Sequence, residues 1–364
     1  MTALTQDVSL AALRIRADEL LDPIVRELAR RPGAVAEMLG LLFASASTDY
    51  EHAGLEQLFS ALPDVAVEEP EHVATGQGLF ALYGPEILLI LGCYALPSAY
   101  AAADGVRVIH RARRLTDDAK RRLCETAQFV INVMKPGGLS SAQIGCRSTH
   151  KVRVMHALVR EHVRQLPGGW PDSSVPINQE ELLGTLLTFS VLVLNGLARM
   201  GATLSEAEQS GYLALWRHIG VLLGIEPSAI PRTIDAAREL AIRIGQRQVR
   251  PCAEGRQLTR QLIDAVDALF PLPGYGLSLM HFFLDESLFG VNVAAVLDLP
   301  PANWTRVLVR GRAAHKKLVL HWLERVPGAR RRRALFSGHF AQRLILWQRP
   351  DERVPFEAPG GIRR

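Results

Sequence analysis

Apolar residues recur along almost the whole chain at the three- and four-residue spacing of amphipathic helices, and the strict alternation typical of β-strands is scarce. Residues 47–75 differ, because they are acidic and irregular. The pattern predicts a single large all-α, globin-like domain that encloses a buried cofactor or substrate pocket. The predicted helices cover residues 9–30, a segment starting after Pro32, 116–134, 146 up to the Pro/Gly breaker at 166–170, 178–201, 205–225, 232–249, 255–269, 277–290, 301–325 and 335–348.

Two of the predicted helices begin with a polar pair that can satisfy free backbone N–H groups. Asn178 is followed three residues later by Glu181, and Ser205 is followed in the same way by Glu208. This is the capping-box spacing, in which each side chain bonds the backbone of the other residue. We therefore expect a helix to start at each of these two pairs.

Two segments, 78–103 and 182–198, are apolar enough to resemble membrane spans. The first is broken by Pro85, Glu86 and Pro97, and the second is short and contains threonine, serine and asparagine. Neither offers the clean apolar run of about 20 residues that crosses a bilayer. Both are predicted to be helices buried on all sides in a large core.

The chain is expected to comprise an N-terminal helical extension (1–75), a main helical domain (76–330) and a basic C-terminal helix and tail (331–364). The net charge is +5, and part of the excess lies in the run ARRRR at 329–333. Aromatic residues make up 6% and are not interleaved with basic ones, so nucleic-acid binding is not expected. The basic tail is either simply solvated or in peripheral contact with an anionic membrane surface.

The cysteines and the known catalytic motifs narrow the function classes. The four cysteines are far apart and form no C-x-x-C pair, which fits a reducing cytoplasm and argues against a disulfide framework or a zinc site. Phosphate loops, dinucleotide fingerprints, G-x-S-x-G elbows and H-E-x-x-H are absent from the sequence. A helical protein of this kind would do its chemistry with a group bound between helices.

The segment 146–162 carries the candidate chemistry. At 100° per residue, Thr149, Arg153, His156 and Arg160 fall on one narrow stripe, and valine, leucine and methionine occupy most of the remaining surface. A surface helix normally shows a wider polar arc. The stripe therefore faces either a polar or anionic object inside the protein, or solvent along one edge of a buried helix. Spacing alone leaves both interpretations open.

Three ordered motifs resemble the catalytic domain of the MpaB and latex-clearing-protein oxygenases. They are V-R-x-M-H-A-x-V-R at 152–160, N-Q-E-x-L-x-G-T at 178–185, and W-R-x-I-G-x-x-L-G-I at 216–225. The resemblance covers about residues 76–235 and, more weakly, the helices that follow. It implies a helical fold that binds haem b and an enzyme that cleaves carbon–carbon double bonds of isoprenoid chains with dioxygen.

The resemblance also implies roles for the polar stripe. His156 would ligate the haem iron through a neutral imidazole. Arg153 would lie beside the haem as an orienting charge or a propionate partner, and Arg160 is a further candidate for that role. His150 is a candidate base.

The chain departs from latex-clearing proteins at the expected proximal ligand. Leu187 stands where those proteins have their histidine, and there is no histidine between 163 and 217. Either the iron ligand has moved to His156, or this branch has lost haem. Thr185, on the same apolar helix, would belong to the pocket wall or bond back to its own helix.

Three functions follow as hypotheses. The first is a haem b-dependent oxygenase that acts with dioxygen on an apolar, isoprenoid or lipid-like substrate. The second is a non-catalytic haem- or lipid-binding protein with the same fold. The third is a haem-free isomerase or cyclase that uses the same apolar pocket.

Overall fold

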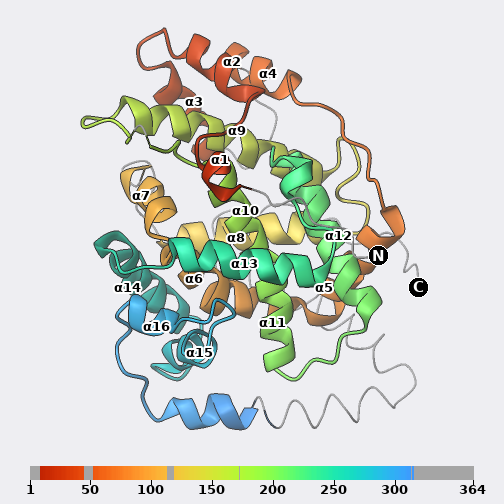
Figure 1. Ribbon diagram of the computed structural model, residues 1–364, viewed down its shortest axis with the longest axis vertical. Helices are drawn as coiled ribbons and strands as arrows, with labels where there is room; N and C mark the ends of the chain where they lie inside the picture. The colour runs from red at the N-terminus through yellow and green to blue at the C-terminus, as the bar shows by residue number, and fades with distance from the viewer. Residues whose placement is uncertain (1–8, 45–51, 113–118, 172, 313, 315–364) are drawn as a thin grey trace.

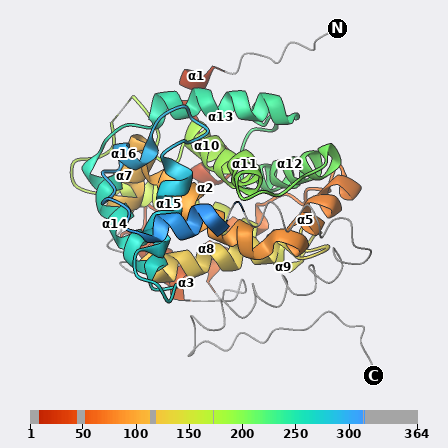
Figure 2. The ribbon, with the colours of Figure 1, turned by 90° about the horizontal axis from the view of Figure 1, so that it is seen from below.

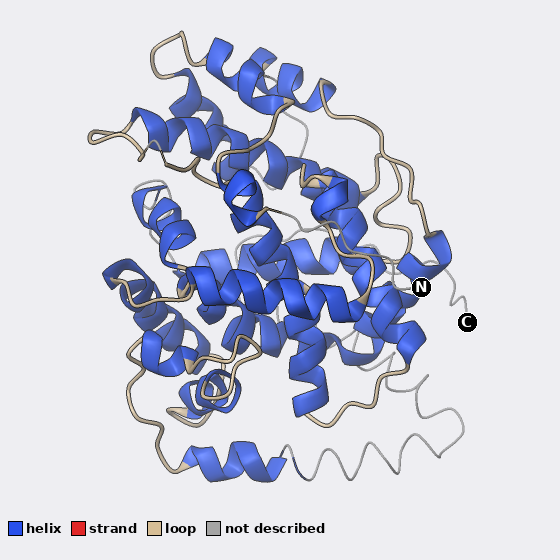
Figure 3. Ribbon diagram, viewed as in Figure 1, coloured by secondary structure: helices blue, strands red, loops and turns tan. Residues whose placement is uncertain are grey.

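The computed structural model describes residues 9–44, 52–112, 119–171, 173–312 and 314. Within these residues the chain is built from helices and forms no sheet (Figure 3), so the all-α prediction is confirmed. The elements are α1 (Leu10–Arg14), α2 (Leu21–Leu28), α3 (Ala34–Ala44), α4 (Ala53–Ser60), α5 (Pro70–Ile90), a π-helical turn (Leu91–Ala95), α6 (Leu96–Tyr100), α7 (Ala103–Ala112), α8 (Ala119–Met134), α9 (Ile144–Gln165), α10 (Gln179–Phe189), α11 (Val191–Arg199), α12 (Glu206–Leu222), a 3-10 turn (Pro227–Ala229), α13 (Ile234–Gln248), α14 (Ala253–Asp267), α15 (Tyr275–Leu284) and α16 (Val293–Val296).

The N-terminal segment departs from the predicted single helix over 9–30, because α1 and α2 are separated by an irregular link. Asp18 lies in this link, and its Oδ1 accepts hydrogen bonds from the backbone N–H groups of Leu20 and Leu21, both at 3.1 Å. Asp18 follows the end of α1, and these bonds satisfy N–H groups at the beginning of α2, so a new helix starts there. The unbroken-helix prediction is therefore wrong at these residues.

A short helix also interrupts the stretch 47–75 that was predicted to be irregular. This helix is α4, and the His52 side chain caps it by accepting from the Leu55 N–H at 3.4 Å. Helices α2, α3 and α4 pack over α9 around a buried apolar cluster that includes Leu21, Met38 and Leu158. They form the top of the molecule in Figure 1.

One expected segment boundary lies inside a helix, and the other lies outside the described residues. The predicted boundary at residue 75 lies inside α5, in the part of this helix that precedes its kink at Tyr83. The predicted C-terminal helix and basic tail, 331–364, lie outside the described residues, as do residues 313 and 315–325 of the predicted helix 301–325.

The two strongly apolar segments form the centre of the fold. Pro70–Tyr100 and Gln179–Arg199 are long and apolar enough to span a membrane, and most of each apolar window is buried inside the protein. The first stays helical past Pro85 through a kink at Tyr83 and a π-helical turn. The second divides at Ser190, whose φ of −102° and ψ of −88° separate α10 from α11. The predicted single helix 178–201 is thus two consecutive helices.

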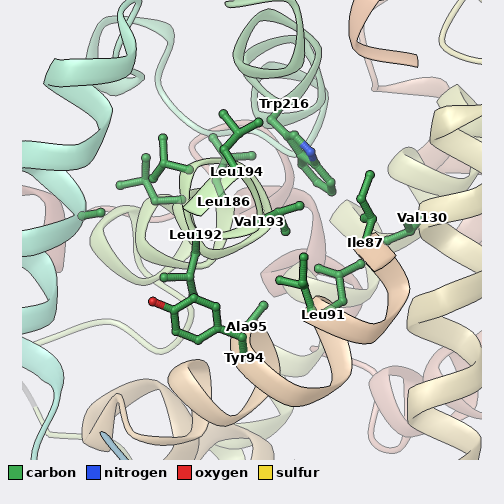
Figure 4. Close-up of a cluster of buried hydrophobic side chains, with 14 of the residues drawn as sticks. Ile87, Leu91, Tyr94, Ala95, Val130, Leu186, Leu192, Val193, Leu194 and Trp216 are labelled. Atoms are coloured by element: carbon green, nitrogen blue, oxygen red, sulfur yellow. The ribbon is translucent and has the colours of Figure 1, made fainter. Parts of the chain in front are cut away.

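Side chains from these segments meet in one apolar cluster. Figure 4 shows Ile87 and Leu91 on the side of Val193, Tyr94 beside Leu192, and Trp216 of α12 in the same cluster. Helix α5 crosses α12 at glycines, since a Cβ added to Gly76 would lie 2.5 Å from the carbonyl oxygen of Gly211. The two helices lie side by side in Figure 2. This close crossing brings Trp216 to the wall of the cavity described next.

Candidate functional site: an apolar cavity beside His156

A cavity of about 490 Å³ lies between helices α6 to α10, α12 and α13. Its size is within the range of about 300–1,000 Å³ that is usual for ligand and cofactor sites. The wall is mainly apolar, with a small number of polar side chains. The apolar lining includes Phe43, Val108, Ile109, Phe129, Val152, Met155, Val159, Leu182, Leu186, Phe189, Trp216, Leu223, Ile244 and Phe289.

His156 is the histidine that α9 presents to this cavity. Its Nδ1 is buried and has no hydrogen-bond partner in the described part of the chain. Burial lowers the pKa of the imidazole to about 4, and the nearby charge of Arg160 acts in the same direction. His156 is therefore neutral at physiological pH, which is the form that ligates iron.

The other residues of the polar stripe face the protein's own carboxylates. Arg153 donates to both oxygens of Asp18, from Nε at 2.7 Å and from Nη2 at 3.0 Å. Arg160 donates from Nη1 to Asp22 Oδ1 at 2.8 Å. Both arginines are buried, so the wet-edge interpretation is wrong, and the anionic partner they face comes from the N-terminal segment. Neither arginine lines the cavity, and their expected roles beside haem remain predictions.

Burial of these ion pairs costs desolvation free energy, which the attraction within each pair opposes. Burial raises the pKa of Asp18, but the hydrogen bond and charge of Arg153 outweigh it and keep that pKa below its usual value. Burial raises the pKa of Asp22 and lowers that of Arg160 despite their mutual attraction. Arg160 gains further partners in the backbone carbonyls of residues 176 and 177, both at 3.1 Å. The stripe thus clamps α9 to the link between α1 and α2 and to the start of α2.

Several motif residues complete this clamp. Gln179 donates from Nε2 to the carbonyls of Ala17 at 2.8 Å and Gly224 at 2.9 Å. Gly224 has a φ of +83°, and an added Cβ would lie 2.7 Å from Arg153 Nε, so only glycine fits there. The three sequence motifs therefore meet at one structural junction beside the cavity.

The remaining sequence-predicted site residues lie in different places. Thr185 lines the cavity and also donates back to the Glu181 carbonyl at 2.9 Å. Leu187, on the same helix, is 2% exposed and belongs to the core instead of the cavity wall. His150 lies away from the cavity, with Nε2 3.8 Å from Cys146 Sγ, and burial lowers its pKa. Only His156 and Thr185 of the predicted set share the cavity.

Sequence reasoning missed several polar groups in the cavity wall. Ser98, Arg122, Glu181, Trp216 and Gln248 all line it and carry buried polar atoms without a hydrogen-bond partner among the described residues. Helical periodicity places such residues on a helix, but it does not identify which polar side chains line a cavity formed together with other helices. Unpartnered buried polar atoms are uncommon in folded proteins, so their concentration here points to a bound molecule.

Glu181 belongs both to the cap of α10, which the sequence predicted, and to the cavity wall, which it did not. Asn178 caps α10 by accepting from the Glu181 N–H at 3.0 Å, as the sequence predicted. The carboxyl group of Glu181 also belongs to the cavity wall, where its Oε1 has no hydrogen-bond partner in the described ranges of the chain. Burial raises its pKa to about 7, although Arg14 and Asn178 oppose the shift. This group can therefore hold or release a proton near neutral pH.

Replacing Glu181 with glutamine is expected to change the pH dependence of stability. The folded carboxyl titrates at about 7 and the unfolded one near 4.5, so the folded state binds more protons between these values and wild-type stability falls as pH rises through this window. Because the variant lacks this titrating group, its free energy of unfolding relative to that of the wild type should increase by on the order of 3 kcal/mol from pH 4.5 to pH 8. Chemical denaturation of both proteins across this range measures it.

His156 contributes in the opposite sense, because its pKa of about 4 in the folded state makes stability rise with pH up to about 6.5. The difference between variant and wild type, and not the wild-type profile, is therefore the informative quantity. Glu206→Gln, at an exposed position on α12, is the matched control. A Glu181→Gln difference that stays constant from pH 4.5 to 8 would contradict the assignment.

No cluster of three or more His, Cys, Asp or Glu side chains that could hold a metal ion occurs among the described residues. The four cysteines are free thiols, as the sequence predicted. Within this part of the chain His156 therefore has no protein partners with which to complete a metal site. An iron bound there would need its other ligands from a macrocycle.

Comparison with known proteins agrees with this architecture. The family model described as "ER-bound oxygenase mpaB/B'/Rubber oxygenase, catalytic domain" matches residues 73–342. The rubber oxygenase of Streptomyces sp. (strain K30) is 28% identical over 156 residues, which cover 42% of this chain and 38% of that protein. The aligned part is therefore well under half of the rubber oxygenase's length.

The fold is similar to that of latex clearing protein LCP in the closed state. The TM-score is 0.68 at 19% sequence identity, and the match covers 93% of this chain and 91% of that structure. The family model spans most of the chain and includes the cavity-bearing helices from α5 onward. The chain belongs to the family of MpaB-type and rubber oxygenase catalytic domains.

Proposed function

We propose that this protein is a haem b-dependent oxygenase that uses dioxygen to cleave a carbon–carbon double bond in an apolar, isoprenoid-like substrate. The observation that carries the proposal is a neutral histidine, His156, with an unpartnered ring nitrogen in the wall of a large apolar cavity. Membership of an oxygenase family supports the class of reaction. The free thiols are consistent with a cytoplasmic location, which is part of the proposal.

The residues of the cavity fit a haem group. A flat apolar macrocycle suits the aliphatic and aromatic lining, and His156 supplies the imidazole that haem iron prefers. Arg122 is the cation that lines the cavity among the described residues, and its Nε has no hydrogen-bond partner. We therefore assign His156 to the iron and Arg122 to a propionate, since Arg153 and Arg160 already pair with Asp18 and Asp22.

The surrounding side chains would prepare the site for oxygen chemistry. Haem, when bound, supplies the binding and activation of dioxygen. Apolar side chains such as Leu186 and Phe189 keep water from the reacting double bond. Glu181, whose pKa lies at about 7, can hold a proton at the cavity wall or accept one from a substrate.

A visible spectrum of the purified full-length protein, expressed with haem supply, tests the cofactor assignment. We expect a Soret band and a haem content, measured as the pyridine haemochrome, of about one per chain. A colourless protein would reject the oxygenase proposal and favour a haem-free isomerase or cyclase. A haem-loaded protein that consumes no dioxygen with any unsaturated substrate would instead indicate a binding protein.

A further inference from the structure

One end of the cavity is polar, and three helices bring it together. Backbone pairing between Ala102 and Val249 joins the segment after α6 to the end of α13. An ion pair between Glu180 Oε1 and Arg247 Nε, 3.0 Å apart, joins the start of α10 to the same end of α13. A Cβ added to Gly184 would lie 3.1 Å from Ile244, one turn later than Glu180 on α10 and one turn earlier than Arg247 on α13. The start of α10 and the ends of α6 and α13 therefore converge.

Three side chains that line the cavity at this end carry polar atoms without a hydrogen-bond partner among the described residues. Gln248, 3% exposed, has neither amide atom bonded, and Ser98, 2% exposed, has an unbonded hydroxyl. Glu181 adds the unbonded Oε1. A buried polar group without a partner destabilises the protein, so a molecule that forms hydrogen bonds with these atoms gains affinity from them.

The chemistry of this end selects against anions. An amide, a hydroxyl and a carboxyl group offer both donors and acceptors, but no free positive charge. Arg14 pairs with Asp104 at 2.7 Å, and Arg247 pairs with Glu180. Arg122, on the α8 wall of the cavity, is the residue assigned above to a haem propionate, so in the haem-loaded protein it is engaged as well. A carboxylate or phosphate would meet the acidic side chains without a counter-ion. A ligand hydroxyl group can both donate to and accept from these side chains, and a ligand carbonyl group can accept from them. Neither group brings a charge into the site.

We propose that Ser98, Glu181 and Gln248 form a head-group subsite that binds the terminal hydroxyl or carbonyl of an otherwise apolar substrate. This inference rests on the proposed function, since it names the substrate class for the same cavity. The apolar remainder of the cavity accommodates the chain of the substrate. The subsite fixes which double bond of an extended chain lies near His156, because one end of the chain is anchored.

The test compares binding of three ligands with one carbon skeleton to the purified full-length protein. Farnesol, the matching hydrocarbon and the matching carboxylate are measured by equilibrium dialysis, without turnover. We expect the alcohol to bind at least about tenfold more tightly than the hydrocarbon, as two net hydrogen bonds would give, and the carboxylate to bind no better than the hydrocarbon. Gln248→Leu should reduce the alcohol preference to within about twofold of unity, and Ser98→Ala should reduce it in part.

Gln261→Leu is the matched control. Gln261 also has a buried, unpartnered side-chain oxygen, but it lies on α14 and does not line the cavity, so its loss should leave the alcohol preference unchanged. Ser98→Ala, a small change, keeps the test decisive if Gln248→Leu fails to fold. An alcohol preference that is absent in the wild type, or that survives in both variants, overturns the inference.

The result is separable from the test of the proposed function. If Gln248→Leu lowers haem content but leaves the alcohol preference intact, the subsite faces the cofactor and the inference fails. A haem-free protein that still prefers the alcohol would support the subsite and reject the oxygenase. A haem-loaded, oxygen-consuming protein with no such preference would reject the subsite alone.

Discussion

His156→Ala is expected to lose haem. The substitution removes the imidazole that the cavity offers to iron, while leaving the ion-pair clamp of α9 intact. Mutation of a residue that only hydrogen-bonds to a metal ligand already lowers metal affinity by about 10–100-fold. Loss of the ligand itself should therefore weaken haem binding by at least about a hundredfold. Haem titration of the wild type and the variant, followed at the Soret band, measures the difference.

Controls on the same helices make this result specific. His150→Ala, one and a half turns earlier on α9 and outside the cavity, should retain full haem content. Added imidazole should restore a Soret band to His156→Ala, since the space it vacates opens on the cavity. Leu187→His should not rescue the variant, because Leu187 lies in the core. Unchanged haem affinity in His156→Ala would show that the iron is held elsewhere.

Arg160→Ala is expected to destabilise the protein by about 3–5 kcal/mol. Arg160 is 1% exposed, and its loss leaves the Asp22 carboxylate and two backbone carbonyls buried without their donor. The same substitution removes a bond between α9 and the N-terminal helices that cover it. Urea denaturation of the wild type and the variant gives the free energies of unfolding.

Arg164→Ala is the matched control, one turn further along α9. Arg164 is partly exposed and lies 3.8 Å from Glu161, so its removal should cost less than about 1 kcal/mol. Asp22→Asn combined with Arg160→Met should recover part of the loss, because the uncompensated charge is gone. A loss below about 1 kcal/mol for Arg160→Ala would contradict the clamp.

The polar stripe of α9 illustrates what sequence could and could not predict. The spacing left open whether Arg153, His156 and Arg160 face something buried or a wet edge, and the structure buries both arginines. The spacing could not show that two of the three face Asp18 and Asp22, because those residues lie more than a hundred positions earlier in a segment predicted to be continuous helix. Pairing over such separations is a property of the packed fold.

The cavity shows the same limit. Periodicity and caps located many of the helices but not the breaks after Arg14 and at Ser190. The family resemblance singled out His156, which the structure places in the cavity wall. Gln248 and Ser98 carried no sequence signal, since each is an ordinary polar residue near a helix end. Their importance comes from burial without partners, which depends on how α6, α10 and α13 converge.

The coupling of oxygen uptake to product formation tests the proposed reaction most directly. Cleavage of a double bond by dioxygen consumes one molecule of oxygen for every two carbonyl groups formed. The haem-loaded protein, supplied with an unsaturated isoprenoid, should show this ratio, and His156→Ala should show neither uptake nor carbonyl formation. Product formation without oxygen uptake, or equal turnover in His156→Ala, would contradict a haem oxygenase built on this cavity.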